Sequence, residues 1–360
     1  MTEEKYAALR RIGWSDHFEQ LAMAQGIDPG RTARVLSAQR GLFLVSDGQS
    51  ERLCTPSGKL RRRDRDYPVT GDWVLVDEGV VHCVLPRRNT LRRGDAGARG
   101  SQTGAARREQ PLGANIDTVF IVGGLDRDYN LRRLERFLAL VYNCGMEPVL
   151  VLTKADLHRD PDAFREEVEA IAFGAPVVLT STDDGRGVVD LRGYLGQGRT
   201  AAMIGSSGAG KSSLANMLCG SDVQATSAVS ESVGKGRHTT TTRELLPMPG
   251  GGLLMDNPGI REIAFSQGGD GLEASFADIL ELADSCRFAD CSHLREPGCA
   301  VIHAVESGAL SPERLENYRK MQREMDYAQA RSEKSANCVE KERWKGVAME
   351  VKRMYKRRGR

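Results

Sequence analysis

The pattern of apolar positions changes three times along the chain. Residues 1–30 carry apolar side chains at helical spacing, whereas residues 31–108 show short alternating runs separated by Asp-Gly, Ser-Gly and Glu-Gly pairs. Continuous apolar runs then alternate with helical patterns over residues 109–265, and beyond residue 266 helical spacing dominates. Because period two indicates strands and period 3.6 indicates helices, the pattern predicts four regions of different architecture.

The first two regions predict a helical extension and a small β-barrel. Residues 1–30 indicate a short amphipathic helix, broken near Gly13. Residues 31–108 contain about five short strands without a helix-length pattern between them, which is typical of a small antiparallel barrel of the OB type. The runs that indicate strands are Ala33–Leu36, Gly41–Val45, Asp72–Val76 and Val80–Leu85. We expect the basic segment Arg61–Arg65 in a loop of this barrel, where it can contact a nucleic-acid backbone.

The third region predicts an α/β domain with a doubly wound, mainly parallel sheet. Its continuous apolar runs are typical of buried parallel strands, and they cover residues 117–122, 148–152, 176–179, 200–204 and 253–255. A helix is predicted over residues 131–142, and a linker without apolar periodicity over 94–112. Since loops at the carboxyl ends of such strands carry function, we expect the site there.

The fourth region, residues 266–360, predicts an α-helical domain with a Cys/His cluster and a basic tail. The clearest helical patterns cover residues 313–328 and 340–355, and the second leads into the basic tail 356–360.

A phosphate-binding loop lies between a predicted strand and a predicted helix. Glycines at 205, 208 and 210 let backbone N–H groups surround a phosphate, while Lys211 can bridge β- and γ-oxygens and Ser212 can ligate Mg²⁺. The predicted nucleotide contacts are Gly205, Ser206, Ser207, Gly208, Ala209, Gly210, Lys211, Ser212 and Ser213, and Lys211 is also a predicted catalytic residue.

The guanine-reading motif, Thr153-Lys154-Ala155-Asp156, precedes this loop, whereas in an ordinary GTPase it follows. The Asp156 carboxylate can accept from the two N–H groups at the guanine edge, a donor pair that adenine lacks. Thr153 stands where Asn is usual, and we expect it to lose an amide that braces the phosphate loop. Asp256 and Gly259, which come later, match a γ-phosphate sensor. The motifs predict a circularly permuted GTPase.

Between the phosphate loop and the sensor, residues 234–242 match a first switch segment. Either Thr239 or Thr240 can supply a hydroxyl to Mg²⁺, and the sequence leaves that choice open. Ile260 occupies the position where many GTPases have a water-aligning Gln. His238 is the titratable side chain nearby with a suitable acceptor nitrogen, so we expect it, or a group supplied by a partner, to align the attacking water.

A metal site is predicted in the last region, where Cys286, Cys291, His293 and Cys299 fall within fourteen residues. Three thiols and one imidazole at this density are typical of a closed, tetrahedral structural zinc site. His303 is an alternative to His293 as the nitrogen ligand.

Charge is segregated along the chain although the formal net charge is only +2. Residues 31–108 hold 16 basic and 8 acidic residues, and residues 311–360 hold 15 and 8, so the remainder is acidic. Two basic regions favour a polyanionic partner, with phosphates as the obvious charges. The sequence lacks an eighteen-residue apolar run and a signal-peptide core, and its eight cysteines, three of them clustered, indicate a metal site in a reducing compartment more than a disulfide framework. We therefore expect a cytoplasmic protein without a membrane span.

The order of basic barrel, permuted GTPase and Cys/His domain resembles the bacterial ribosome small subunit-dependent GTPase A family. The resemblance rests on the motifs at 153–156, 205–213, 236–241 and 256–259 and on the Cys/Cys/His/Cys set. It implies a factor in late maturation of the 30S ribosomal subunit whose barrel and zinc domain contact 16S rRNA and whose GTP hydrolysis is faster on the subunit. It also implies a catalytic role for His238. We also expect the protein to be a monomer.

Two other functions compete with this interpretation. An RNA-binding switch with negligible turnover, or a regulator unrelated to ribosomes, would share the same motifs, and turnover with and without 30S subunits separates these from the first interpretation. A P-loop ATPase or kinase is disfavoured by Asp156 and by the absence of a kinase-like lid signature.

Overall fold

The structure is a computed structural model that describes residues 3–39, 41–62, 67–93, 110–172, 174–220, 244–256, 273 and 275–333. Some predictions therefore lie outside the described residues. These are most of the linker, the switch segment with His238, Thr239 and Thr240, the sensor residue Gly259, the helix over 340–355 and the basic tail.

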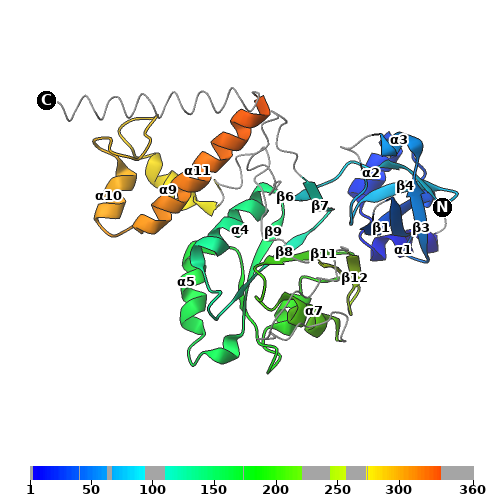
Figure 1. The fold of residues 1–360 in the computed structure, drawn as a ribbon, viewed down its shortest axis with the longest axis horizontal. Coiled ribbons are helices and arrows are strands. Elements are labelled where there is room, and N and C mark those ends of the chain that lie inside the picture. The colour runs from blue at the N-terminus through cyan, green and yellow to red at the C-terminus, as the bar shows by residue number, and fades with distance from the viewer. Residues whose placement is uncertain are drawn as a thin grey trace, which may run out of the picture.

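Two helices precede a closed five-stranded barrel, which is drawn in blue in Figure 1. Helices α1 (Glu3–Arg11) and α2 (Asp16–Ala24) lie on either side of Gly13, whose φ of 95° permits the predicted break. A 3-10 turn, η1 (Pro29–Arg31), leads into strands β1 (Thr32–Gln39), β2 (Leu42–Ser46), β3 (Glu51–Pro56), β4 (Trp73–Asp77) and β5 (Val80–Val84), with helix α3 (Gly58–Arg61) between β3 and β4. The strand order is β1-β2-β3-β5-β4, and β4 pairs again with β1. The predicted barrel is confirmed.

Three details of the barrel differ from the sequence prediction. β3 carries no predicted run because only Cys54 and Pro56 of its six residues are buried, so its apolar alternation is weak. β3 also pairs with β5 in parallel, whereas the prediction was an antiparallel barrel. Of the predicted basic segment Arg61–Arg65, Arg61 ends the short helix α3 and Arg62 follows it directly, whereas residues 63–65 lie outside the described residues.

The α/β domain is built on a parallel sheet with the predicted strands. In spatial order these are β10 (Val177–Leu179), β9 (Glu147–Thr153), β8 (Thr118–Gly124), β11 (Thr200–Gly205) and β13 (Leu253–Asp256), and β12 (Glu244–Pro247) is antiparallel at the far side of β13. The connecting elements are α4 (Leu131–Asn143), η3 (Ala155–Leu157), α5 (Asp162–Ala172), α6 (Val188–Arg192) and α7 (Lys211–Cys219).

The two faces of this sheet are covered by different helices because successive strand residues point to opposite sides. On β8, Val119 and Ile121 belong to one core cluster with residues of α4 and α5. Phe120 and Val122 belong to a second cluster with residues of α6 and α7. Burial on both faces explains why these strands read as continuous apolar runs.

The chain between the barrel and the α/β domain forms a two-stranded ribbon of β6 (Thr90–Arg93) and β7 (Gln110–Ala114). The sequence predicted linker as far as residue 112, which is wrong for residues 110–112. The local sequence gives little apolar alternation, and Pro and Gly lower strand propensity in Gln110-Pro111-Leu112-Gly113-Ala114. The strand forms because it pairs with β6, which the local pattern does not show.

One ladder joins the barrel to the α/β sheet. Strand β12 pairs with β13 on one side and with β1 of the barrel on the other, where Ser37 lies opposite Glu244. The two sheets are therefore hydrogen-bonded to each other through β12.

A buried arginine reinforces this junction. Arg34 of β1 donates from Nη1 to the Ile12 carbonyl at 2.5 Å, from Nη2 to the Asn115 carbonyl at 3.0 Å and from Nε to the Gly71 carbonyl at 3.4 Å. Burial lowers the pKa of Arg34 to about 10, which still leaves it protonated at neutral pH. One guanidinium thus connects the N-terminal helices, the barrel and the α/β domain.

The C-terminal region contains helices α9 (Ala277–Ala283), α10 (Ala300–Glu306) and α11 (Pro312–Glu333), and α11 packs against α4. Arg314 of α11 donates to Glu135 of α4 at 2.6 Å and to Asp278 of α9 at 2.7 and 2.9 Å, and Asn317 donates to Glu135 as well. Figure 1 shows these helices and the barrel on opposite sides of the α/β domain. α11 is longer than the predicted 313–328 helix.

Replacing Arg34 should destabilise the junction. Arg34→Leu leaves the Ile12 and Asn115 carbonyls without their donor, and we expect a loss of about 3 kcal/mol in unfolding free energy. Thermal unfolding followed by circular dichroism measures the effect. Arg31→Leu is the matched control, since its ion pair with Asp77 is about half exposed and should contribute about 1 kcal/mol or less. Equal shifts for both variants would contradict the role of Arg34.

Candidate nucleotide and metal sites

The predicted phosphate loop connects β11 to α7. Gly205, Gly208 and Gly210 have φ values of 150°, 84° and 87°, and a Cβ on Gly205 would lie 2.2 Å from the Val122 carbonyl oxygen. All three positions favour glycine because L side chains rarely adopt such φ angles, and at Gly205 the backbone also passes too close to β8 for a Cβ. Lys211 Nζ donates to the Gly205 carbonyl at 2.9 Å and to the Ser206 carbonyl. The loop and the first turn of α7 form the type of backbone arrangement that binds phosphate.

Thr153 braces this loop, contrary to the expectation from the sequence. Its Oγ1 donates to the Ala209 carbonyl of the phosphate loop at 2.7 Å and lies 3.4 Å from the Gly123 carbonyl. The predicted loss of a brace is therefore wrong. Thr153 ends β9, and β8 separates β9 from β11, so the contact spans the carboxyl end of the intervening strand.

The remainder of the guanine-reading motif lies at the same edge of the sheet. Lys154 has a left-handed backbone with a φ of 61°, which turns the chain from β9 into η3. The Ala155 N–H donates to the Thr180 carbonyl at 3.1 Å, so the loop after β10 lies against the motif. Asp156 is exposed, as expected of a side chain that reads a ligand.

The loop between β8 and α4 is part of this site, although the sequence pattern did not single it out. Asp126 accepts a hydrogen bond from Lys154 Nζ at 2.6 Å, and the same ammonium donates to the Gly208 carbonyl at 2.8 Å. Asp128 accepts from the Ser206 hydroxyl. The loop matches none of the GTPase motifs, so only the fold could place it beside them.

The sensor residue Asp256 ends β13, which pairs in parallel with β11. Met255 lies opposite Ala202, so the Asp256 backbone comes to the same edge as Gly205. Only the backbone of Asp256 belongs to the described part of the chain.

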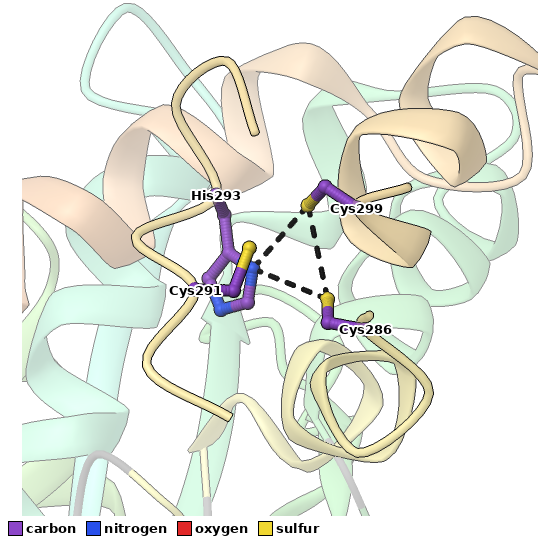
Figure 2. Close-up of side chains that lie close together, drawn as sticks. All are labelled: Cys286, Cys291, His293 and Cys299. Carbon is purple, nitrogen blue, oxygen red and sulfur yellow. Dashed lines mark hydrogen bonds between the residues drawn. The ribbon is translucent and has the colours of Figure 1, made fainter. Parts of the chain in front are cut away.

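The four predicted metal ligands meet in the C-terminal region (Figure 2). The Sγ atoms of Cys286, Cys291 and Cys299 and a ring nitrogen of His293 all lie within 4.8 Å of one another. His293 Nδ1 lies 3.6 Å from Cys286 Sγ and 3.4 Å from Cys299 Sγ, and the two sulfurs are 3.8 Å apart. His303 is exposed on α10 and does not belong to this cluster. The donor set and its spacing suit a tetrahedral metal.

Local backbone structure explains how these ligands converge. Cys286 lies just after α9, Cys299 caps the start of α10, and His293 adopts a left-handed backbone with a φ of 54° in the loop between them. Burial alone would raise the pKa of Cys286, but N–H groups of Val301 and Ala300 donate to its sulfur and hold that pKa below its ordinary value. Donors at the start of a helix favour a thiolate, which is the form that binds metal.

Comparison with known proteins identifies this combination of sites. The family model described as RsgA GTPase matches residues 84–266. A protein of Syntrophotalea carbinolica named small ribosomal subunit biogenesis GTPase RsgA is 40% identical over 98% of this chain and 99% of its own length. The chain belongs to the RsgA GTPase family.

Solved structures agree with this assignment. The crystal structure of YjeQ from Thermotoga maritima is 32% identical, covers 82% of this chain and 98% of its own, and superposes with a TM-score of 0.59. The structure of YloQ, described as a circularly permuted GTPase, is 25% identical, covers 82% and 94%, and gives a TM-score of 0.57. The predicted fold class is confirmed, and the chain is a GTPase, a hydrolase that acts on GTP.

The brace from Thr153 can be tested by removing its hydroxyl. Thr153→Val keeps the side-chain shape but leaves the buried Ala209 carbonyl without this donor, so we expect a loss of about 1–2 kcal/mol and a lower melting temperature. Thr118→Val is the control. Thr118 on β8 is also buried, but its Oγ1 has no hydrogen-bond partner among the described residues, so its replacement should be neutral or stabilising. If Thr153→Val is as stable as the wild type, Thr153 does not brace the phosphate loop.

Proposed function

We propose that this GTPase binds the small (30S) ribosomal subunit and hydrolyses GTP during late maturation of that subunit, with the subunit stimulating hydrolysis. The observation that carries the proposal is the 40% identity, over nearly the full length of both chains, to a protein named small ribosomal subunit biogenesis GTPase. The match extends beyond the GTPase domain into the barrel and the C-terminal helices. A function that needs all three parts fits such a match better than a function of the GTPase domain alone.

In this proposal the loops at the carboxyl edge of the sheet bind GTP or GDP. Residues 205–213 surround the phosphates with backbone N–H groups, and Lys211 neutralises their charge. Asp156 reads the guanine edge, while Thr153, Lys154 and Ala155 shape the base pocket. Thr180 supports this assignment, since its carbonyl accepts from the Ala155 N–H.

Mg²⁺ fits the residues that surround the phosphate position. Ser212 lies on the first turn of α7, and Asp256 ends the strand beside β11. These residues, with either Thr239 or Thr240, would hold the ion, which supplies positive charge to the β- and γ-phosphates. The Gly259 N–H would contact the γ-phosphate, and His238 would orient the attacking water.

Zinc fits the cluster of Cys286, Cys291, His293 and Cys299. Three soft sulfur ligands and one imidazole nitrogen favour Zn²⁺ over hard cations such as Mg²⁺. In this role the metal would hold α9, α10 and their connecting loop together, because His293 is the only buried residue of the loop 284–298.

The barrel is the proposed contact to 16S rRNA. Arg52, Lys59, Arg61 and Arg62 are all exposed on it, and exposed basic side chains attract phosphates without requiring a base sequence. We propose that the protein acts as a monomer. We also propose that it works in the cytoplasm, where its ribosomal partner is found. No helix in the described ranges has the length and apolar content to cross a membrane.

We propose that β12 transmits conformational changes at the nucleotide site to the barrel. This strand begins at Glu244, directly after the segment that carries the predicted switch, and it pairs with β1 of the barrel. We propose that rearrangement of the switch in the GTP and GDP states shifts this ladder and thereby changes the fit of the barrel to rRNA.

Phosphate release with and without purified 30S subunits tests the proposed function. We expect stimulation by 30S subunits of at least about tenfold, and no hydrolysis by Lys211→Ala, because phosphate charge is no longer neutralised. His238→Ala should still bind nucleotide but lose roughly 10²-fold in kcat. If 30S subunits do not change the rate of GTP hydrolysis, the protein would be a nucleotide switch that acts outside ribosome maturation. If His238→Ala hydrolyses GTP at the full rate, a group other than His238 aligns the attacking water.

Base specificity tests the guanine pocket separately. Asp156→Asn presents an amide donor where xanthine has an acceptor, so preference should shift from GDP toward XDP, with GDP affinity falling by at least about tenfold. Equilibrium titration with both nucleotides measures the shift. Asp160→Asn, four residues along and also exposed, is the matched control. Unchanged GDP affinity without a gain for XDP would remove Asp156 from the pocket.

Metal content tests the zinc assignment. Protein purified without chelator should hold one equivalent of zinc by plasma emission spectroscopy, because a closed site releases its metal slowly. Cys299→Ala should lose the zinc and the order of the C-terminal helices while keeping GDP binding. Cys83→Ala, which removes a thiol from the barrel, should keep both. A metal-free wild-type protein would contradict the assignment.

A further inference from the structure

The strongest unassigned feature near the nucleotide site is the Asp126 carboxylate. Both of its oxygens are engaged: Oδ2 accepts from Lys154 Nζ at 2.6 Å, and Oδ1 accepts from the Asp128 N–H at 3.0 Å. The second contact fixes the carboxylate in a local turn, so that it meets Lys154 in a defined orientation. Although partial burial opposes it, the Lys154 ammonium holds the pKa of Asp126 below its ordinary value.

The contact reaches two motif segments at once. The ammonium that Asp126 holds also donates to the Gly208 carbonyl at 2.8 Å, so Lys154 links the guanine motif to the phosphate loop. The Leu125 N–H donates to the Thr153 carbonyl at 2.9 Å, which ties the loop after β8 to the end of β9. Asp128 of the same loop accepts from Ser206. The β8–α4 loop therefore contacts the motif from two directions.

We propose that Asp126 is a positioning residue of the guanine site, which anchors the Lys154 ammonium so that the lysine stem lies across the base. A lysine side chain loses about 2 kcal/mol of rotamer entropy when it is fixed. If Asp126 already fixes the lysine before the nucleotide binds, less of this entropy is lost on binding. The inference rests on the nucleotide site proposed above.

This role predicts a specific kinetic signature. Lys154 would contact the base, which is the same in substrate and product, so loss of the anchor should weaken GTP and GDP equally. Asp126→Asn should raise both dissociation constants by roughly fivefold and raise KM by a similar factor, with kcat at saturating GTP unchanged. The effect is modest because the two side chains are 32% and 31% exposed, so solvent screens part of the attraction. Asp126→Glu, which keeps the charge, should recover part of the affinity.

A double-mutant cycle on the full-length protein tests the inference, with a fluorescent GDP analogue as the probe at fixed ionic strength. Asp126→Asn should weaken binding in the wild-type background but change it by less than twofold when Lys154 is already Ala. Asp160→Asn is the control for loss of one negative charge. Equal effects of Asp126→Asn in both backgrounds, or no effect in the wild type, would overturn the role of Asp126 alone. If Lys154→Ala itself leaves GDP affinity unchanged, the proposed base pocket fails as well.

Discussion

The parallel pairing of β9, β8, β11 and β13 is the constraint on which the nucleotide site depends. Because parallel strands bring their carboxyl ends to one edge, the loops after all four strands meet there whatever their order along the chain. Thr153 can therefore reach Ala209 across β8, although 56 residues separate them in sequence. Circular permutation changes which loop is synthesised first and leaves the geometry of the site intact.

The same pairing explains what the sequence could and could not predict. The phosphate loop was predictable because glycine spacing, a preceding apolar strand and a following helix are all local signals. The metal cluster was predictable for a similar reason, since its ligands lie within fourteen residues. The part played by Thr153 was mispredicted, because a side chain that departs from a motif does not reveal which carbonyl it meets.

Long-range contacts between parts of the molecule could not be predicted from the sequence either. Arg34 lies in a barrel strand whose local pattern gives no sign of the Asn115 carbonyl, and Glu135 lies on a helix whose pattern does not indicate burial against Arg314. Strand β3 was missed because most of its side chains face water. For Arg34 and Glu135 the deciding contact is with residues far away in the chain, whereas periodicity reports only on near neighbours.

These contacts link the three parts of the molecule. β12 connects the sheet that carries the nucleotide site to the barrel, while the ion pair of Glu135 and Arg314 connects α4 to the C-terminal helices. α4 follows directly from the loop that holds Asp126 and Asp128. Both outer parts are thus attached to elements that begin or end beside the nucleotide site, an arrangement suited to coupling nucleotide state with binding to a large partner.

The affinity for purified 30S subunits in two nucleotide states tests this coupling most directly. With saturating non-hydrolysable GTP analogue, the dissociation constant should be lower than with GDP by about tenfold, a typical allosteric coupling of 1–3 kcal/mol. Equal affinity in the two states would contradict the coupling between the nucleotide site and the surfaces that bind the subunit.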